Sequence, residues 1–430
     1  MNEPNLNPAT RFHALDGLRA AMMLLGLVLH SACNYQHTPA DAAWGFRDSQ
    51  THELFSFMVS FIHVWRMPIF MFIAGFFSAL LVERRGTESF LSNRVARLGI
   101  PFVIFLPLTL PLTTSGFYFA NVFRFAGSVK AGFEKYSIDM MGGLFPPITI
   151  HLWFLYYLFL YCLISFMLLQ LGRQLLPESI RNLPTKIIGT IMTIPGGSIL
   201  LCIPLAYALN KSAGLLITGL AFIPETTSFF SYGFIYLCGW AFWSQRSLLE
   251  KLRSWPKTIF ALVMTLVLYP IWMDFFLQWV GLPPGQITAA LCNLLDVETL
   301  QRSTILWLGA SVSALMVWNA IWGFLGLFLL TANRRIPFIR YFVDGSYWVY
   351  LIHLPLTIWI PGLLCNVELG VFSKFSITLF TTTAIGFISY DLFVRSTFIG
   401  QILNGRRWPR ALGKALLNRD LAPPEGETRG

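Results

Sequence analysis

The sequence predicts an all-α, polytopic membrane protein with about ten transmembrane helices, and three observations support this prediction. The 430 residues are 55% hydrophobic and only 12% charged, with a mean hydropathy of +0.60. Such a composition is typical of membrane proteins rather than soluble domains. Apolar stretches long enough to cross a bilayer recur along the chain. Basic residues are concentrated between alternate stretches, as in multi-pass proteins.

Ten apolar runs approach or exceed the roughly 20 residues of helix that a bilayer requires, and polar segments with Gly or Pro separate them. In chain order, the predicted spans are 14–33, 55–82, 98–120, 149–171, 187–209, 228–245, 258–280, 305–331, 346–364 and 373–394. The sixth and ninth spans are interrupted or bordered by Gly and Pro. The second and third are joined by a segment, 83–97, in which arginines alternate with apolar residues. We expect a short amphipathic helix there, at the membrane interface.

The spans form one membrane domain, 14–395, because no loop between them is long enough to fold alone. A short segment, 1–13, precedes this domain. A tail, 396–430, follows it and is basic at first and then rich in Pro, Glu and Gly. Since such a composition buries little apolar surface, we expect the tail to be disordered.

The distribution of basic residues predicts that both termini are cytoplasmic. With ten spans, the termini and the even-numbered loops share one side of the membrane, and that side carries 22 of the 31 Lys and Arg. The net charge of +10 is therefore mainly an orientation signal and does not indicate a nucleic-acid partner. The six Cys lack the spacing of metal ligands, so we predict no metal site.

Two polar residues in the first span, Arg19 and His30, lie eleven positions apart. Eleven steps of about 100° bring both side chains to one helix face, roughly 16 Å apart along the axis. Ionisable residues in a span are costly and usually face the protein interior or a water-filled path. The pair would therefore suit an elongated ligand. In the alternative explanation, Arg19 pairs only with Asp16, one turn earlier, and His30 caps the outer end.

Further ionisable residues extend this pair across the predicted membrane. Arg94 and Arg97, three positions apart, lie at the cytoplasmic boundary, and Arg66 lies near the midplane of the second span. The candidates for the acceptor side or for supporting roles, besides Asp16, are His63, His151 and His353. Each histidine also has a structural explanation. His63 could orient Arg66, and His151 could be part of an interfacial aromatic belt. His353 could form a hydrogen bond between helices.

An acyl-CoA fits this arrangement. Arginines would bind its phosphates, and its pantetheine arm is about as long as the distance from Arg19 to His30. The thioester would then reach His30. This imidazole could act as general base toward an acceptor hydroxyl, or attack the thioester first and carry the acyl group covalently; the sequence leaves both mechanisms open. We expect no bound cofactor, since the acyl-CoA is a co-substrate.

Five motifs resemble those of the acyltransferase-3 family of integral membrane acyltransferases: DGLRAAMMLLGLVLH, FIHVWRMPIFMFIAGFF, FLSNRVARLGIPF, HLWFLYYL and YFVDGSYWVYLIHLPLT. Within it, the chain looks closest to the glucan biosynthesis protein C branch, proposed to succinylate periplasmic glucans. The family's Arg-x10-His motif matches Arg19 and His30, and its Arg-x-x-Arg motif matches Arg94 and Arg97. The resemblance implies ten core helices, a cytoplasmic acyl-CoA donor and an extracytoplasmic carbohydrate acceptor.

The leading hypothesis is a multi-pass O-acyltransferase of the bacterial inner membrane. It would transfer a succinyl or acetyl group from succinyl-CoA or acetyl-CoA to hydroxyls of a periplasmic glucan or related glycan. The lipid bilayer surrounds it, and proteins of glycan synthesis are further candidate partners. Two alternatives remain: a transporter or channel for an anion or polysaccharide, and a non-catalytic subunit of glycan assembly. The lack of a convincing internal repeat weighs mildly against the transporter.

Overall fold

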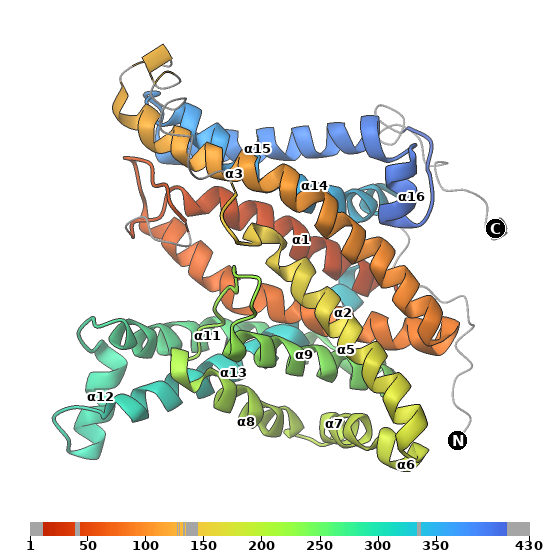
Figure 1. Cartoon of the computed structure of the whole chain (residues 1–430). Helices are drawn as coiled ribbons and strands as arrows, with labels where there is room; N and C mark the ends of the chain where they lie inside the picture. Colours follow the sequence, from red (N-terminus) through yellow and green to blue (C-terminus); the bar gives the residue numbers. More distant parts are fainter. Residues whose placement is uncertain are drawn as a thin grey trace.

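The computed structural model describes residues 12–38, 44–126, 145–332 and 337–410, together with the isolated residues 128, 130, 131 and 134. Throughout this part of the chain the regular structure is helical (Figure 1). The longer helices are α1 (His13–Cys33), α2 (Glu53–Arg94), α3 (Ile100–Ala126), α5 (Trp153–Leu175), α7 (Leu183–Thr193), α8 (Gly197–Leu209), α9 (Thr226–Ser244), α11 (Trp255–Trp279), α12 (Gln286–Leu295), α13 (Arg302–Thr331), α14 (Pro337–Leu364) and α15 (Val371–Ser389).

Short helical turns complete the described chain. These are η1 (Val95–Gly99), η3 (Ile150–Leu152), α6 (Glu178–Arg181), η4 (Asn210–Ser212), α10 (Leu248–Leu252), η5 (Tyr390–Val394) and α16 (Phe398–Asn404). Helix α16 lies inside the segment that we expected to be a disordered tail. This part of the tail is therefore folded, whereas 411–430 lie outside the described residues.

The all-helical prediction is confirmed, but the count of ten spans is not. Seven helical segments of the described chain are long and apolar enough to cross a membrane: His13–Cys33, Glu53–Phe125, Ile150–Leu175, Trp255–Trp279, Arg302–Thr331, Ile339–Leu364 and Val371–Val394. The second of them, which runs through α2, η1 and α3, covers two predicted spans. Helix α9 coincides with the predicted span 228–245 but is not among the seven.

The predicted span 187–209 is not one helix, and its sequence explains why. Ile194 is extended, as the residue before a proline usually is, and Gly196 is left-handed with φ of 76°. The Pro195–Gly196 pair thus separates α7 from α8. The segment 83–97 is helical, as expected, although it continues α2 beyond a kink at Gly86, where φ is 78°.

Helix α1 lies within the bundle, where it packs against α2, α13, α14 and α15. In Figure 1, α3, α14 and α15 lie on one side of α1, and the group α7, α8, α9, α11 and α13 lies beyond α2. The close contact of α2 with α9 depends on Gly75 and Gly239. A Cβ on either glycine would overlap a backbone carbonyl oxygen of the other helix. Small residues allow such an approach between helices.

One end of the bundle, on the right of Figure 1, contains α16 and the first turns of α1, and we call it the α16 end. Helix α1 ends and α15 begins at the opposite end. The ionisable residues of α1 are thus spread between the two ends, with Arg19 nearer α16.

Candidate active site

Three histidines from distant parts of the chain meet at the last turn of α1. The ring of His353, on α14, lies 5.1 Å from the ring of His30 and 5.1 Å from that of His151, measured between centroids. His151 and His353 are buried, and His30 is half-buried. We call these three residues the histidine cluster.

Backbone carbonyls fix the orientation of two of the rings. Nδ1 of His353 lies 2.7 Å from the Tyr350 carbonyl oxygen, and Nε2 of His151 lies 3.2 Å from that of Leu351. Because a carbonyl only accepts hydrogen bonds, these nitrogens carry the hydrogen in the neutral rings, and the other nitrogen of each ring presents a lone pair. Nε2 of His353, Nδ1 of His151 and Nδ1 of His30 are buried and have no hydrogen-bond partner among the described residues. The cluster can therefore accept protons.

The guanidinium of Arg66, on α2, lies beside the histidine cluster. It lines the same small cavity as the three imidazoles, and a Cβ on Gly26 would overlap its Nη1 atom. Gly26 precedes His30 by about one helical turn. Within the described ranges no carboxylate pairs with Arg66, and its buried Nε has no hydrogen-bond partner. A positive charge without an acidic partner thus faces the imidazoles.

A larger cavity of about 460 Å³ opens at the α16 end, and we call it the arginine cavity. The basic residues that line it are Arg19, Arg85, Arg94, Arg97 and Arg406. Among the described residues, two carboxylates line it, and each has an arginine partner. Asp16 lies 3.5 Å from Arg19, and Asp344 lies 3.1 Å from Arg340. The excess positive charge suits a ligand with several negative charges.

The two cavities adjoin. Four residues line both of them, and we call them the neck: Met23, Phe70, Phe154 and Tyr350. The Tyr350 hydroxyl donates a hydrogen bond to the carbonyl of His151 at 2.9 Å, so the neck is also attached to the cluster. A long ligand with a charged end in the arginine cavity could therefore place its other end at the imidazoles.

The structure brings most of the predicted residues together in these cavities. Arg19, Asp16, Arg94 and Arg97 line the arginine cavity, and Arg66, His30, His151 and His353 line the smaller one. The pairing of Arg19 with Asp16 agrees with the alternative explanation, yet it leaves Arg19 in the wall of the cavity. His63 lines neither cavity. Its Nε2 lies 3.0 Å from the Leu216 carbonyl, which favours a structural role.

Among the residues of these walls that the sequence did not single out are Arg85, Tyr350 and Arg406. Arg85 lies in an Arg-Arg pair beside a span, a pattern that usually indicates only the orientation of a membrane protein, but it lines the arginine cavity. Tyr350 lies in a run of the sequence that is rich in aromatic residues, so its position gave no reason to assign it to a site. Arg406 lies in the segment predicted to be a disordered tail. A cluster of basic residues close to the last span was the feature of the sequence that could have indicated its role.

Trp44 covers the histidine cluster on the side away from the arginine cavity. Its ring lies 5.4 Å from that of His30, and its Nε1 donates to Oδ1 of Asn34 at 3.0 Å. Asn34 is fully buried, and its Nδ2 donates to the carbonyls of His30 and Thr357 at 3.2 and 2.9 Å. The end of α1, α14 and Trp44 are therefore held together by one amide side chain.

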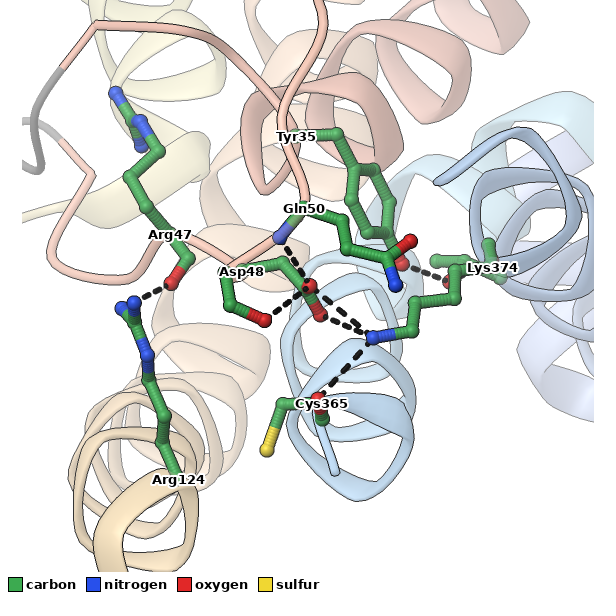
Figure 2. A network of polar contacts seen from close by, with 9 residues as sticks. Tyr35, Arg47, Asp48, Gln50, Arg124, Cys365 and Lys374 are labelled. Atoms are coloured by element: carbon green, nitrogen blue, oxygen red, sulfur yellow. Dashed lines mark hydrogen bonds and ion pairs between the residues drawn. The ribbon is translucent and has the colours of Figure 1, made fainter. Parts of the chain in front are cut away.

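A buried ion pair fixes the segment that carries Trp44 (Figure 2). Nζ of Lys374 lies 3.1 Å from both carboxylate oxygens of Asp48, and the two side chains are 1% and 0% exposed. Nζ also donates to the Cys365 carbonyl at 3.1 Å. The Asp48 amide donates to the Asn34 carbonyl at 2.8 Å. The chain that follows α1 is thus attached to the start of α15.

Comparison with known proteins agrees with this architecture. Residues 12–391 match the family model of the acyltransferase-3 group, described as Acyltransferase domain. The chain is 23% identical over 407 residues to Glucans biosynthesis protein C of Escherichia coli strain K12, with 93% of this chain and 96% of the relative covered. The protein of the same name from Escherichia coli O1:K1 is 24% identical over 408 residues, with the same coverage. No solved structure matches significantly. The family match spans most of the sequence, so the chain belongs to the acyltransferase-3 family.

Proposed function

We propose that the protein is an inner-membrane O-acyltransferase that uses cytoplasmic acyl-CoA to acylate a periplasmic glucan or related glycan. The observation that supports this most is the junction of the arginine cavity with the histidine cluster through the neck. The arginine cavity would bind the phosphates of the donor, and its pantetheine arm would pass the neck. Both termini would then be cytoplasmic. The name of the relatives, Glucans biosynthesis protein C, supports a glucan as the acceptor.

In the proposed reaction, the oxygen of an acceptor hydroxyl attacks the thioester carbonyl carbon near His30. The hydroxyl proton passes to a histidine lone pair, the carbon–sulfur bond breaks, and the proton is then delivered to the CoA thiolate. Alternatively, a nitrogen of His30 attacks the thioester carbonyl first, the carbon–sulfur bond breaks, and the CoA thiolate leaves with the proton that the imidazole loses. The acceptor hydroxyl then attacks the acyl-imidazole, the carbon–nitrogen bond breaks, and the hydroxyl proton returns to His30. In both routes the cluster supplies an imidazole whose nitrogen has no other partner in the described structure.

Mass spectrometry of periplasmic glucans from a deletion strain tests this proposal, because it identifies the acyl group and the acceptor together. Loss of an acyl substituent, restored by the wild-type gene but not by a His30→Ala gene, is the expected result. Unchanged glucans would exclude this acceptor. Accumulation of unmodified glucan inside the cell would instead favour the transporter.

We predict that Arg94→Ala and Arg97→Ala each weaken CoA binding by roughly 10- to 100-fold, and that lysine only partly restores it. Each guanidinium can make two charge-assisted hydrogen bonds to a phosphate, whereas an ammonium meets one oxygen at a time. Titration of purified protein with CoA measures the effect. Arg173, whose Nη1 donates to Thr87 and which lies outside the arginine cavity, is the matched control for substitution by alanine. Equal affinity in all variants would contradict a phosphate-binding role.

The position of Arg66 favours a succinyl over an acetyl donor, because a succinyl thioester carries a free carboxylate that an acetyl thioester lacks, and Arg66 is a cation beside the imidazoles. We predict that Arg66→Gln lowers kcat/KM for succinyl-CoA about 100-fold more than for acetyl-CoA, since the carboxylate would lose its charged partner. Initial rates with the two donors measure this ratio. Equal losses with both donors would assign Arg66 to the thioester or phosphates rather than to the acyl carboxylate.

A further inference from the structure

The chain that follows η5 forms part of the arginine cavity, although the match to the family model ends at residue 391. Three of its residues line the cavity: Leu403, Asn404 and Arg406. None of them lines the smaller cavity that contains the histidine cluster. The segment therefore faces the part of the arginine cavity that does not adjoin the imidazoles.

Hydrogen bonds hold this segment in place. The Thr397 hydroxyl accepts from the Ile399 amide and begins α16, and Nδ2 of Asn404 donates to the Asp344 carbonyl at 3.1 Å. Beyond the helix, the Trp408 amide donates to the Arg395 carbonyl at 2.8 Å, and Nε of Arg395 donates to the Pro409 carbonyl at 2.8 Å. The segment is therefore attached on both sides of residues 405–407.

Gly405 makes room for Arg97. It ends α16 in the left-handed conformation, with φ of 77°, and a Cβ at this position would overlap Nη2 of Arg97. Any larger residue would therefore be strained in its backbone and would also displace the guanidinium. The glycine thus affects a residue of the arginine cavity that lies more than 300 positions earlier in the chain.

Arg406 adds a positive charge next to Arg97. Its guanidinium lies over the Trp408 ring, 4.2 Å from the centroid, which leaves the edges of its planar fork free to bind an anion. Among the described residues no carboxylate pairs with it. Arg406 and Arg97 together form a basic part of the wall of the arginine cavity, and neither lines the smaller cavity that contains the histidine cluster.

We propose that residues 398–408 complete the binding site for the nucleotide end of the donor. Arg406 would bind a phosphate there, and Gly405 would allow Arg97 to bind alongside it. This inference rests on the proposed use of acyl-CoA, in which the nucleotide is the end farthest from the thioester. It assigns a donor-binding role to a part of the chain outside the matched family domain.

The first test uses Arg406→Ala, with Arg407→Ala as a matched control. Arg407 is the next residue and is exposed, as Arg406 is, but its Nε donates to Gln401 and it does not line the cavity. We expect Arg406→Ala to raise KM for acyl-CoA about 5- to 30-fold, with little change in turnover of an acyl-pantetheine, which carries no phosphate. Equal behaviour of the two variants toward acyl-CoA, or an equal loss with acyl-pantetheine, would overturn the proposal. Failure of the wild-type protein to bind CoA would instead overturn the proposed function.

The second test compares Gly405→Ala with Gly196→Ala. The two glycines have nearly the same φ, 77° and 76°, but a Cβ on Gly196 would meet no atom within 4 Å. Both substitutions therefore introduce the same backbone strain, and only the first disturbs Arg97. We expect weaker CoA binding in Gly405→Ala alone. Equal CoA affinity in the two variants would show that Arg97 needs no help from this segment.

Discussion

Replacement of His30 by alanine is expected to reduce acyl transfer by about 10²–10⁴-fold, and by more if His30 carries the acyl group covalently. The reason is that its imidazole lies 5.1 Å from that of His353, beside a guanidinium without an acidic partner in the described structure. CoA affinity should change little, because His30 does not line the arginine cavity. Initial rates with a glycan acceptor and CoA titration of the same preparation measure both quantities.

His63→Asn is the control for this experiment. It replaces a histidine of α2 that bonds to a backbone carbonyl outside both cavities, and we expect nearly normal rates. Incubation with labelled acyl-CoA and no acceptor would distinguish the two mechanisms, because only covalent transfer leaves label on the wild-type protein. Normal turnover by His30→Ala would show that His30 is not needed for the reaction.

The second large effect is expected at the buried ion pair between Lys374 and Asp48. Lys374→Met leaves the carboxylate with no cation in a position that is 0% exposed, which typically costs 3–5 kcal/mol of folding free energy. We therefore expect a clear loss of thermostability in detergent. Thermal unfolding followed by size-exclusion chromatography measures it.

The double variant Lys374→Met, Asp48→Asn should recover most of this stability. It removes both charges, and the asparagine oxygen can still accept the Gln50 amide hydrogen that Asp48 now accepts at 2.9 Å. Should the double variant be as unstable as the single one, the attraction between the charges would not be the main contribution of this pair. Activity of the stable double variant would then report whether Trp44 is still correctly placed over His30.

The apolar runs of the sequence predicted much of the fold, since such runs identify helices in a membrane protein without reference to tertiary contacts. Helix geometry alone also placed Arg19 and His30 on one face of α1. The division of 187–209 into two helices could have been predicted from Pro195 and Gly196. The apolar composition on both sides of this pair concealed the break.

Contacts between segments that are far apart in the sequence could not be predicted from apolar runs or helix geometry. His151 and His353 reach His30 through the packing of α14 and η3, and no local pattern encodes that packing. The members of the histidine cluster were therefore predicted only as separate residues. The partnership of Asp48 with Lys374, 326 positions apart, was missed for the same reason. The tail was predicted to be disordered from its average composition. Average composition does not reveal individual hydrogen bonds, such as those that fix residues 395–409.

The neck between the two cavities affects whether ions could cross the membrane through this protein. Three of its four residues, Met23, Phe70 and Phe154, are apolar, and a hydrated ion would lose most of its water there. The pantetheine chain of the proposed donor is uncharged and would lose much less. With that donor, the thioester would reach the histidine cluster while the neck itself resists the passage of protons and salts. The membrane potential would be maintained during every cycle of transfer.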